Sequence, residues 1–214
     1  MHCEIFDLGL VDFAKGWNFQ KEVFLKVKDG AYVSALIFCR HYPVITLGRG
    51  ADRGNILISD AELEKKGLKV FRIERGGEVT YHGPGQLTVY PICNLNYLKK
   101  DIHWFLRQLE NIVIASLVDF GAKARQIPGL TGVWVGEEKI ASLGISIKNW
   151  ISFHGLSLNV KNDDLENFSL IRPCGMERRM TAVEKVLGRP IEMESIKEAI
   201  LDRFNSILPT AVAC

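Results

Sequence analysis

The sequence lacks an apolar run long enough to cross a bilayer. Such a span needs about 20 consecutive apolar residues, and the longest run here, from Ala31 to Cys39, is only as long as a strand. The first residues reach Asp7 without a basic start followed by a long apolar stretch, so we expect no signal peptide. These absences predict a soluble, cytoplasmic protein with no membrane partner.

Closely spaced cysteines are also missing. The five cysteines lie far apart, and no C-x-x-C pair occurs. This spacing argues against a disulfide framework and against a zinc site, and we expect neither a metal nor a cofactor. Taken one at a time, each thiol is most simply a small buried residue or an inert surface group. The cysteines are Cys3, Cys39, Cys93, Cys174 and Cys214.

Neither common phosphate-binding glycine motif occurs, and charge of one sign is not in excess. The formal net charge is +2, which does not indicate a polyanion-binding protein. A basic stripe would suit a non-catalytic module that binds an acyl carrier or nucleic acid, but such runs are usually solvated faces. We therefore expect no nucleic-acid partner. The stripe consists of Lys65, Lys66, Lys69, Arg72 and Arg75.

What is present is an ordinary globular composition, with 47% hydrophobic and 24% charged residues. A length of 214 residues fits a single catalytic domain over residues 1–214. Strand and helix patterns are interspersed, which favours an α+β fold with a mixed, largely antiparallel sheet and flanking helices. Helices are predicted over 11–29, 59–67, 101–120 and 191–208, and a short one at a capping box formed by Thr181 and Glu184. Strands are predicted over 31–38, 44–47, 68–74, 86–92, 132–135, 140–147 and 156–160.

The segment Arg75 to Gln86 is the most unusual part of the chain. It contains four glycines and a proline between two predicted strands. Glycines allow a ligand to approach the backbone closely, and Arg75, Thr80 and His82 would place polar groups beside it. A hairpin loop with a Gly-Pro-Gly turn explains the same residues equally well. Composition alone does not separate a binding loop from a simple turn.

Lys139 begins an apolar strand directly after an acidic turn. The simplest interpretation is a surface lysine paired with Glu137 or Glu138, because lysines are mostly solvated. The functional alternative is an ammonium group held in a cleft, where desolvation would lower its pKa.

Cys174 lies between Pro173 and Gly175, a setting that could present a thiol at a loop tip. The guanidinium groups of Arg172 and Arg178 would favour the reactive thiolate. A buried cysteine in an irregular turn is the alternative. His154 and His82 are equal candidates for a base acting on this thiol, and the sequence leaves the choice open.

Five stretches taken together resemble a known family, the lipoyl(octanoyl) transferases, which are octanoyl-[acyl-carrier-protein]:protein N-octanoyltransferases of lipoate biosynthesis. The five stretches occur in the same order as in the family, and they lie between residues 41 and 175. The twelve-residue glycine-rich stretch is the most specific of them. The stretches are 41–49, 75–86, 132–135 with 139–144, 154–160 and 173–175.

The resemblance implies a fold similar to the catalytic domain of biotin and lipoate protein ligases. It also implies a thioester intermediate on Cys174 and a catalytic partner in Lys139, and glycine N–H groups around Gly76, Gly77 and Gly144 could stabilise the oxyanion. Ser157 departs from the family, in which alanine is usual, so acyl preference is where an effect is expected. The acyl pocket maps onto Arg75, Gly76, Gly77, Glu78, Val79, Thr80, Tyr81, His82, Ser142, Leu143, Gly144, Gly155, Leu156 and Ser157.

The implied activity is transfer of an octanoyl or lipoyl group from acyl carrier protein to a specific lysine. The implied acceptors are the apo lipoyl domains of 2-oxoacid dehydrogenase complexes and the glycine cleavage H protein. An ATP-dependent lipoate or biotin ligase is the main alternative, and it would need no cysteine nucleophile. A thiol hydrolase would share Cys174 but would release the free acid.

Overall fold

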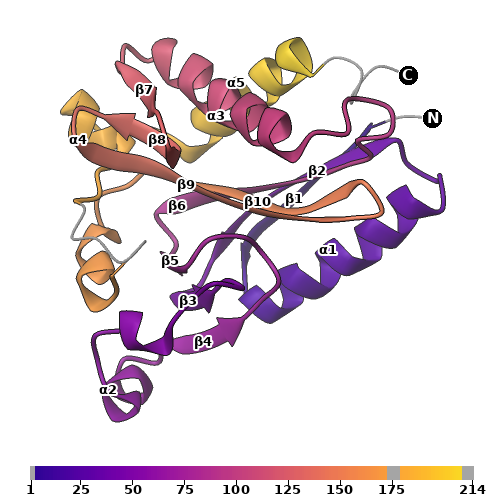
Figure 1. Ribbon diagram of the computed structural model, residues 1–214. Helices are drawn as coiled ribbons and strands as arrows, with labels where there is room; N and C mark the ends of the chain where they lie inside the picture. The colour runs from indigo at the N-terminus through magenta and orange to yellow at the C-terminus, as the bar shows by residue number, and fades with distance from the viewer. Residues whose placement is uncertain (1–2, 173–178, 209–214) are drawn as a thin grey trace.

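The computed structural model describes residues 3–172 and 179–208. Two sheets organise the chain (Figure 1). The larger has the strand order β1-β2-β6-β10-β9-β8-β7 and the smaller the order β4-β3-β5. Among the strands of the described residues, only β1 with β2 and β3 with β4 pair in parallel, which confirms the predicted α+β class with a largely antiparallel sheet. The strands are β1 (Cys3–Val11), β2 (Ser34–His41), β3 (Val44–Leu47), β4 (Lys69–Arg72), β5 (Val79–His82), β6 (Gln86–Cys93), β7 (Ala124–Ile127), β8 (Leu130–Val135), β9 (Glu138–Lys148) and β10 (Ile151–Asn159).

Helices α1, α2 and α3 begin at side chains that cap them, whereas α4 and α5 begin without a side-chain cap. Asp101 accepts a hydrogen bond from the backbone N–H of Trp104, and Ser59 forms the predicted capping box. The second predicted capping box is wrong: α4 begins after Ala182, without a side-chain cap. The helices are α1 (Phe13–Lys28), α2 (Asp60–Lys65), α3 (Ile102–Val118), α4 (Val183–Leu187) and α5 (Met193–Ile207), with 3-10 turns at Arg53–Asn55 and Leu165–Leu170.

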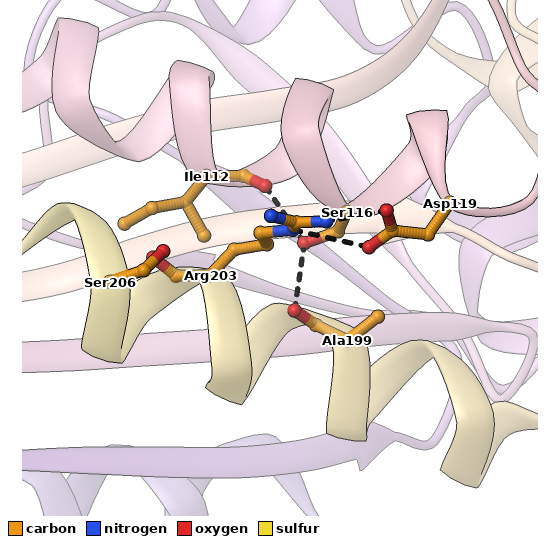
Figure 2. A network of polar contacts seen from close by, with 6 residues as sticks. All are labelled: Ile112, Ser116, Asp119, Ala199, Arg203 and Ser206. Atoms are coloured by element: carbon orange, nitrogen blue, oxygen red, sulfur yellow. Dashed lines mark hydrogen bonds and ion pairs between the residues drawn. The ribbon is translucent and has the colours of Figure 1, made fainter.

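One face of the large sheet is covered by the neighbouring helices α3 and α5 (Figure 1). Apolar side chains from β2, β6, β9 and β10 form the main core with these two helices. Figure 2 shows how the pair is joined. The Ser116 hydroxyl donates to the carbonyl oxygens of Ile112 (2.8 Å) and Ala199 (3.1 Å). Arg203 pairs with Asp119 at the same contact. This face is therefore closed by packing.

The opposite face carries α1 and the small sheet. Val23 and Val27 of α1 pack against Ile37 and Tyr90 of the large sheet. The small sheet has its own core, which includes Ile45, Tyr81, Leu63 and Phe168. Within the described ranges, no helix is long and apolar enough to cross a membrane.

A few polar contacts fix the small sheet against the large one. The backbone N–H of Gly76 donates to the carbonyl of Ile145 in β9 (2.8 Å). Arg75 is buried beside it, and its guanidinium donates to the carbonyl (2.8 Å) and the hydroxyl (3.0 Å) of Thr46 in β3. Arg75 also donates to the carbonyl of Gly76 (3.0 Å). These hydrogen bonds of residues 75 and 76 connect the small sheet to the large one, and the candidate site lies between the two sheets.

Candidate active site

A cavity of about 330 Å³ lies between the two sheets. The predicted pocket residues line it, except Gly76 and Tyr81, and Lys139 lines it as well. Most of the other wall residues are apolar or aromatic, and of these additional residues only His154 was proposed from the sequence, as a base. These additional residues are Phe13, Ile73, Thr88, Tyr90, Gly129, Leu130, Thr131, Trp134, His154 and Met180.

The floor of the cavity includes small residues of β9 and β10. Gly144 lies opposite Gly155, and Ser142 lies opposite Ser157. A Cβ atom added to Gly155 would come within 2.1 Å of the Val89 carbonyl oxygen, and one added to Gly144 would come within 2.8 Å of the Gly76 carbonyl oxygen. Contacts this short are not tolerated by real side chains. Glycine is therefore required where the backbones approach closely.

The glycine-rich segment contains a strand that the sequence did not predict. Residues Val79–His82 form β5, and alternation along this strand turns Thr80 and His82 toward the cavity. Tyr81 points the other way, where its hydroxyl donates to Asp164 (3.1 Å) and its ring packs on Phe168. The N–H of Gly76 is already bonded to the Ile145 carbonyl, so it is not available to stabilise an oxyanion.

Lys139 is buried, with 8% of its surface exposed, at one side of the cavity. Its ammonium lies 5.3 Å from the centre of the Trp134 ring. Glu137 and Glu138 pair with Arg125 and Lys185 respectively. The structure thus supports the cleft interpretation of this lysine over the surface one.

The backbone of Lys139 is held by the chain that follows the undescribed segment 173–178. Its N–H donates to the carbonyl of Arg179 (3.0 Å), and its carbonyl accepts from the N–H of Thr181 (2.9 Å). Cys174 itself lies outside the described residues. Of the described cysteines, Cys39 and Cys93 are buried, and burial raises the pKa of both thiols. Neither they nor Cys3 line the cavity.

The two histidines proposed as bases both line the cavity, and both are buried. His82 stacks on Phe13, and burial lowers its pKa well below the usual value. His154 adopts a left-handed backbone conformation (φ 61°), and its Nε2 lies 3.5 Å from a carboxylate oxygen of Glu74. Burial also lowers the pKa of His154, although Glu74 opposes the shift. Both imidazoles are therefore neutral near pH 7.

A third buried histidine, His41, contacts Tyr90, which lines the cavity. Its Nε2 lies 2.7 Å from the Tyr90 hydroxyl, and its Nδ1 lies 3.1 Å from the Val11 carbonyl. Burial lowers its pKa to about 4. His41 belongs to the family-like stretch 41–49, but no role was assigned to it from the sequence. Among the described residues, no group of histidine, cysteine, aspartate and glutamate could hold a metal ion.

These buried histidines predict a loss of stability in mild acid. An unfolded histidine binds a proton below about pH 6.5, whereas native His41 does so only near pH 4. The unfolded state therefore binds more protons in this window, and stability falls as the pH falls. His41 alone should lower the free energy of unfolding by about 2 kcal/mol between pH 7 and pH 5. Denaturant unfolding at both pH values measures the change.

Two variants separate this effect from general acid sensitivity. His41→Gln should lose a measurable part of the difference between pH 7 and pH 5, whatever its stability at pH 7. His103 is exposed, and His103→Gln should retain the full difference. An unchanged pH dependence in His41→Gln would show that His41 is not the group responsible.

The fold of this chain is the fold of lipoate ligases. A bi-partite lipoate protein ligase from Thermoplasma acidophilum matches with a TM-score of 0.77 at 18% identity, covering 98% of this chain and 84% of the other. A lipoate-protein ligase A structure with bound ATP matches with a TM-score of 0.77 at 17% identity, covering 98% and 86%. Biotin protein ligase from Aquifex aeolicus matches more distantly, with a TM-score of 0.52 at 11% identity over 97% of this chain and 69% of the other.

Sequence comparison places the chain within this group. Residues 12–205 match the lipoyl protein ligase A/B catalytic domain. An octanoyltransferase from Thermoanaerobacter sp. (strain X514) is 43% identical, covering 95% of this chain and 89% of the relative. Another from Gloeobacter violaceus is also 43% identical, covering 96% and 90%. The chain therefore belongs to the lipoyl protein ligase A/B family and, within it, to the octanoyltransferases, which confirms the resemblance seen in the sequence.

Proposed function

We propose that this protein transfers an octanoyl group from acyl carrier protein to a lysine of a lipoyl domain, through a thioester on Cys174. The observation that carries the proposal is the cavity between the sheets, with a buried lysine at one side. Its wall is mainly apolar and of a size for one short acyl chain. Each methylene buried there stabilises the complex by about 0.8 kcal/mol.

The residues that flank Cys174 are tied to cavity residues on both sides, which supports its role. The N–H of Arg172 donates to the carbonyl of Asn55 (2.8 Å), and the side-chain amide of Asn55 donates to Glu78 (3.1 Å), which lines the cavity. On the other side, Arg179 is bonded to Lys139. The described residues on both sides of the segment 173–178 are thus linked to residues that line the cavity.

The reaction has two steps. In the first, the Cys174 thiolate attacks the carrier thioester, the carrier sulfur leaves as a thiol with the proton of the Lys139 ammonium, and one thioester replaces another at little energetic cost. In the second, the amine of the acceptor lysine attacks the acyl-enzyme and gives its proton to neutral Lys139, the cysteine leaves as the thiolate, and an amide forms. Amide formation from a thioester is downhill, so no ATP is required. Lys139 favours the thiolate in the first step and, as the neutral amine, accepts the proton of the attacking lysine in the second.

The partners and the compartment are part of the same proposal. The donor is octanoyl-acyl carrier protein, and the acceptors are the lipoyl domains of 2-oxoacid dehydrogenase complexes and the glycine cleavage H protein. The whole chain acts as a single catalytic domain in the cytoplasm. Relatives named octanoyltransferase support this assignment.

One reaction tests the function against its alternatives. The protein is incubated with octanoyl-carrier protein and an apo lipoyl domain, with and without ATP, and the domain is weighed by intact-mass spectrometry. We expect octanoylation of the domain that does not depend on ATP. Modification that requires ATP and free octanoate would identify a ligase, and free octanoate without modified domain would identify a hydrolase.

A further inference from the structure

Three hydroxyl groups form a row across the floor of the cavity. Ser142 of β9 lies opposite Ser157 of β10, and Ser157 lies opposite Thr88 of β6. Residues directly opposite each other on neighbouring strands point to the same face of a sheet. All three residues line the cavity, and both Ser157 and Thr88 are buried. The row is therefore a polar stripe in a mainly apolar wall.

The hydroxyl of Thr88 has no hydrogen-bond partner in the described part of the chain. Only 1% of the Thr88 surface is exposed. A buried hydroxyl without a partner is costly, whereas valine has nearly the same shape and would fill this strand position without that cost. Packing alone does not explain a threonine here. A polar atom of a bound ligand would supply the missing partner.

The position of Lys139 shows which end of the row of hydroxyl groups lies near the ammonium group. A Cβ atom on Gly132 of β8 would lie 3.0 Å from the Lys139 ammonium, so this ammonium lies beside Gly132. The next residue along β8, Val133, pairs with Ala141, the neighbour of Ser142. The row therefore starts near the Lys139 ammonium and continues over Ser142 and Ser157 to Thr88. Neighbouring strands lie about 4.8 Å apart, so Thr88 lies roughly 10 to 14 Å across the sheet from Lys139.

We infer that Thr88 is a specificity-determining residue that contacts the distal end of the acyl chain. The inference rests on the proposed function, in which the reacting carbonyl lies beside Lys139. An extended eight-carbon chain spans roughly 10 Å, so its far end reaches the strand that carries Thr88. The pocket thereby accepts medium-length acyl chains with a hydroxyl or oxo group at the distal end, besides plain alkyl chains.

The test compares octanoyl-, 8-hydroxyoctanoyl- and 3-hydroxyoctanoyl-carrier protein as donors, with kcat/KM measured for wild type and Thr88→Val. The informative quantity is the ratio of 8-hydroxyoctanoyl to octanoyl transfer. We expect this ratio to fall about tenfold in Thr88→Val, because the variant leaves the distal hydroxyl of the substrate buried without a partner. The ratio for the 3-hydroxy donor should not change, because its hydroxyl lies near the carbonyl.

Two matched variants separate recognition from packing. Thr88→Ser keeps the hydroxyl and should keep the wild-type ratio. Thr181 also has a buried hydroxyl without a partner among the described residues, but it does not line the cavity. Thr181→Val should therefore keep the wild-type ratio as well.

The outcomes distinguish this inference from the function on which it rests. If wild type transfers octanoate and Thr88→Val leaves the ratio unchanged, or lowers transfer of all donors equally, Thr88 does not recognise the distal end. If wild type transfers no octanoyl group from the carrier, the proposed function itself fails. Thermal shifts with octanoic and 8-hydroxyoctanoic acids give a readout that does not depend on turnover, and only the shift with the hydroxy acid should decrease in Thr88→Val.

Discussion

Cys174→Ala should abolish octanoyl transfer, with kcat/KM falling by about 10³-fold or more. In the proposed reaction this thiolate forms the covalent bond to the acyl carbon, and none of the described cysteines lines the cavity. After incubation with octanoyl-carrier protein alone, wild type should gain the mass of one octanoyl group. Cys174→Ala should gain none. Intact-mass spectrometry measures both, and single-turnover transfer to the lipoyl domain gives the loss in rate.

Cys39→Ala is the matched control for this experiment. Cys39 is buried, and its thiol pKa is raised by burial, so it contains almost no thiolate near neutral pH. This variant should form the acyl adduct like wild type. An adduct that persists in Cys174→Ala would place the nucleophile elsewhere and would refute the assignment.

Lys139→Met should slow acylation of the enzyme by about 10²- to 10⁴-fold. Methionine fills a similar volume against Trp134, but it has no charge to favour the thiolate and no amine to accept a proton. Binding of the carrier protein should change far less than the rate, because the side chain lies inside the cavity. Stopped-flow acylation gives the rate, and titration of the carrier protein gives the affinity.

Lys185→Met provides the comparison for the lysine. Lys185 is half-exposed and pairs with Glu138, next to Lys139 in the chain, but it does not line the cavity. Its replacement should leave acylation unchanged. Full activity in Lys139→Met would instead assign proton transfer to His82 or His154, both of which are neutral near pH 7 and line the same cavity.

The sequence correctly predicted the elements whose ends are determined by neighbouring residues, such as helix-capping side chains. The strand over 44–47 and the helix starts at Ser59 and Asp101 occur where the pattern predicts them. Two edge strands, β1 and β7, were missed because charged and polar residues interrupt their apolar alternation. Thr181 shows the opposite failure. It has the spacing of a capping residue, but packing beside Lys139 places the helix start one residue later.

The site was predictable only where a motif marks it. The glycine-rich segment and Lys139 stand out in the sequence, and the structure brings them together around one cavity. Thr88 and Tyr90 could not be recognised as site residues, because the sequence around them has the pattern of an ordinary buried strand. Their place in the wall follows from the pairing of β6 with β10, which joins segments nearly 70 residues apart in the chain, as in the contact of Val89 with Leu156. No local pattern carries that information.

The row of Ser142, Ser157 and Thr88 crosses three neighbouring strands, and under the proposed function this arrangement would let the protein measure the length of an acyl chain. Each strand passed corresponds to about four carbons of an extended chain, since neighbouring strands are about 4.8 Å apart. The longest acyl chain that fits would therefore depend on which strand is the first to carry a side chain that blocks the chain. Because Ser142 and Ser157 are small, the first strand at which a side chain could block the acyl chain is β6. Enlarging the residue on β10 would move the stop back by one strand, so that a shorter acyl group becomes the best fit.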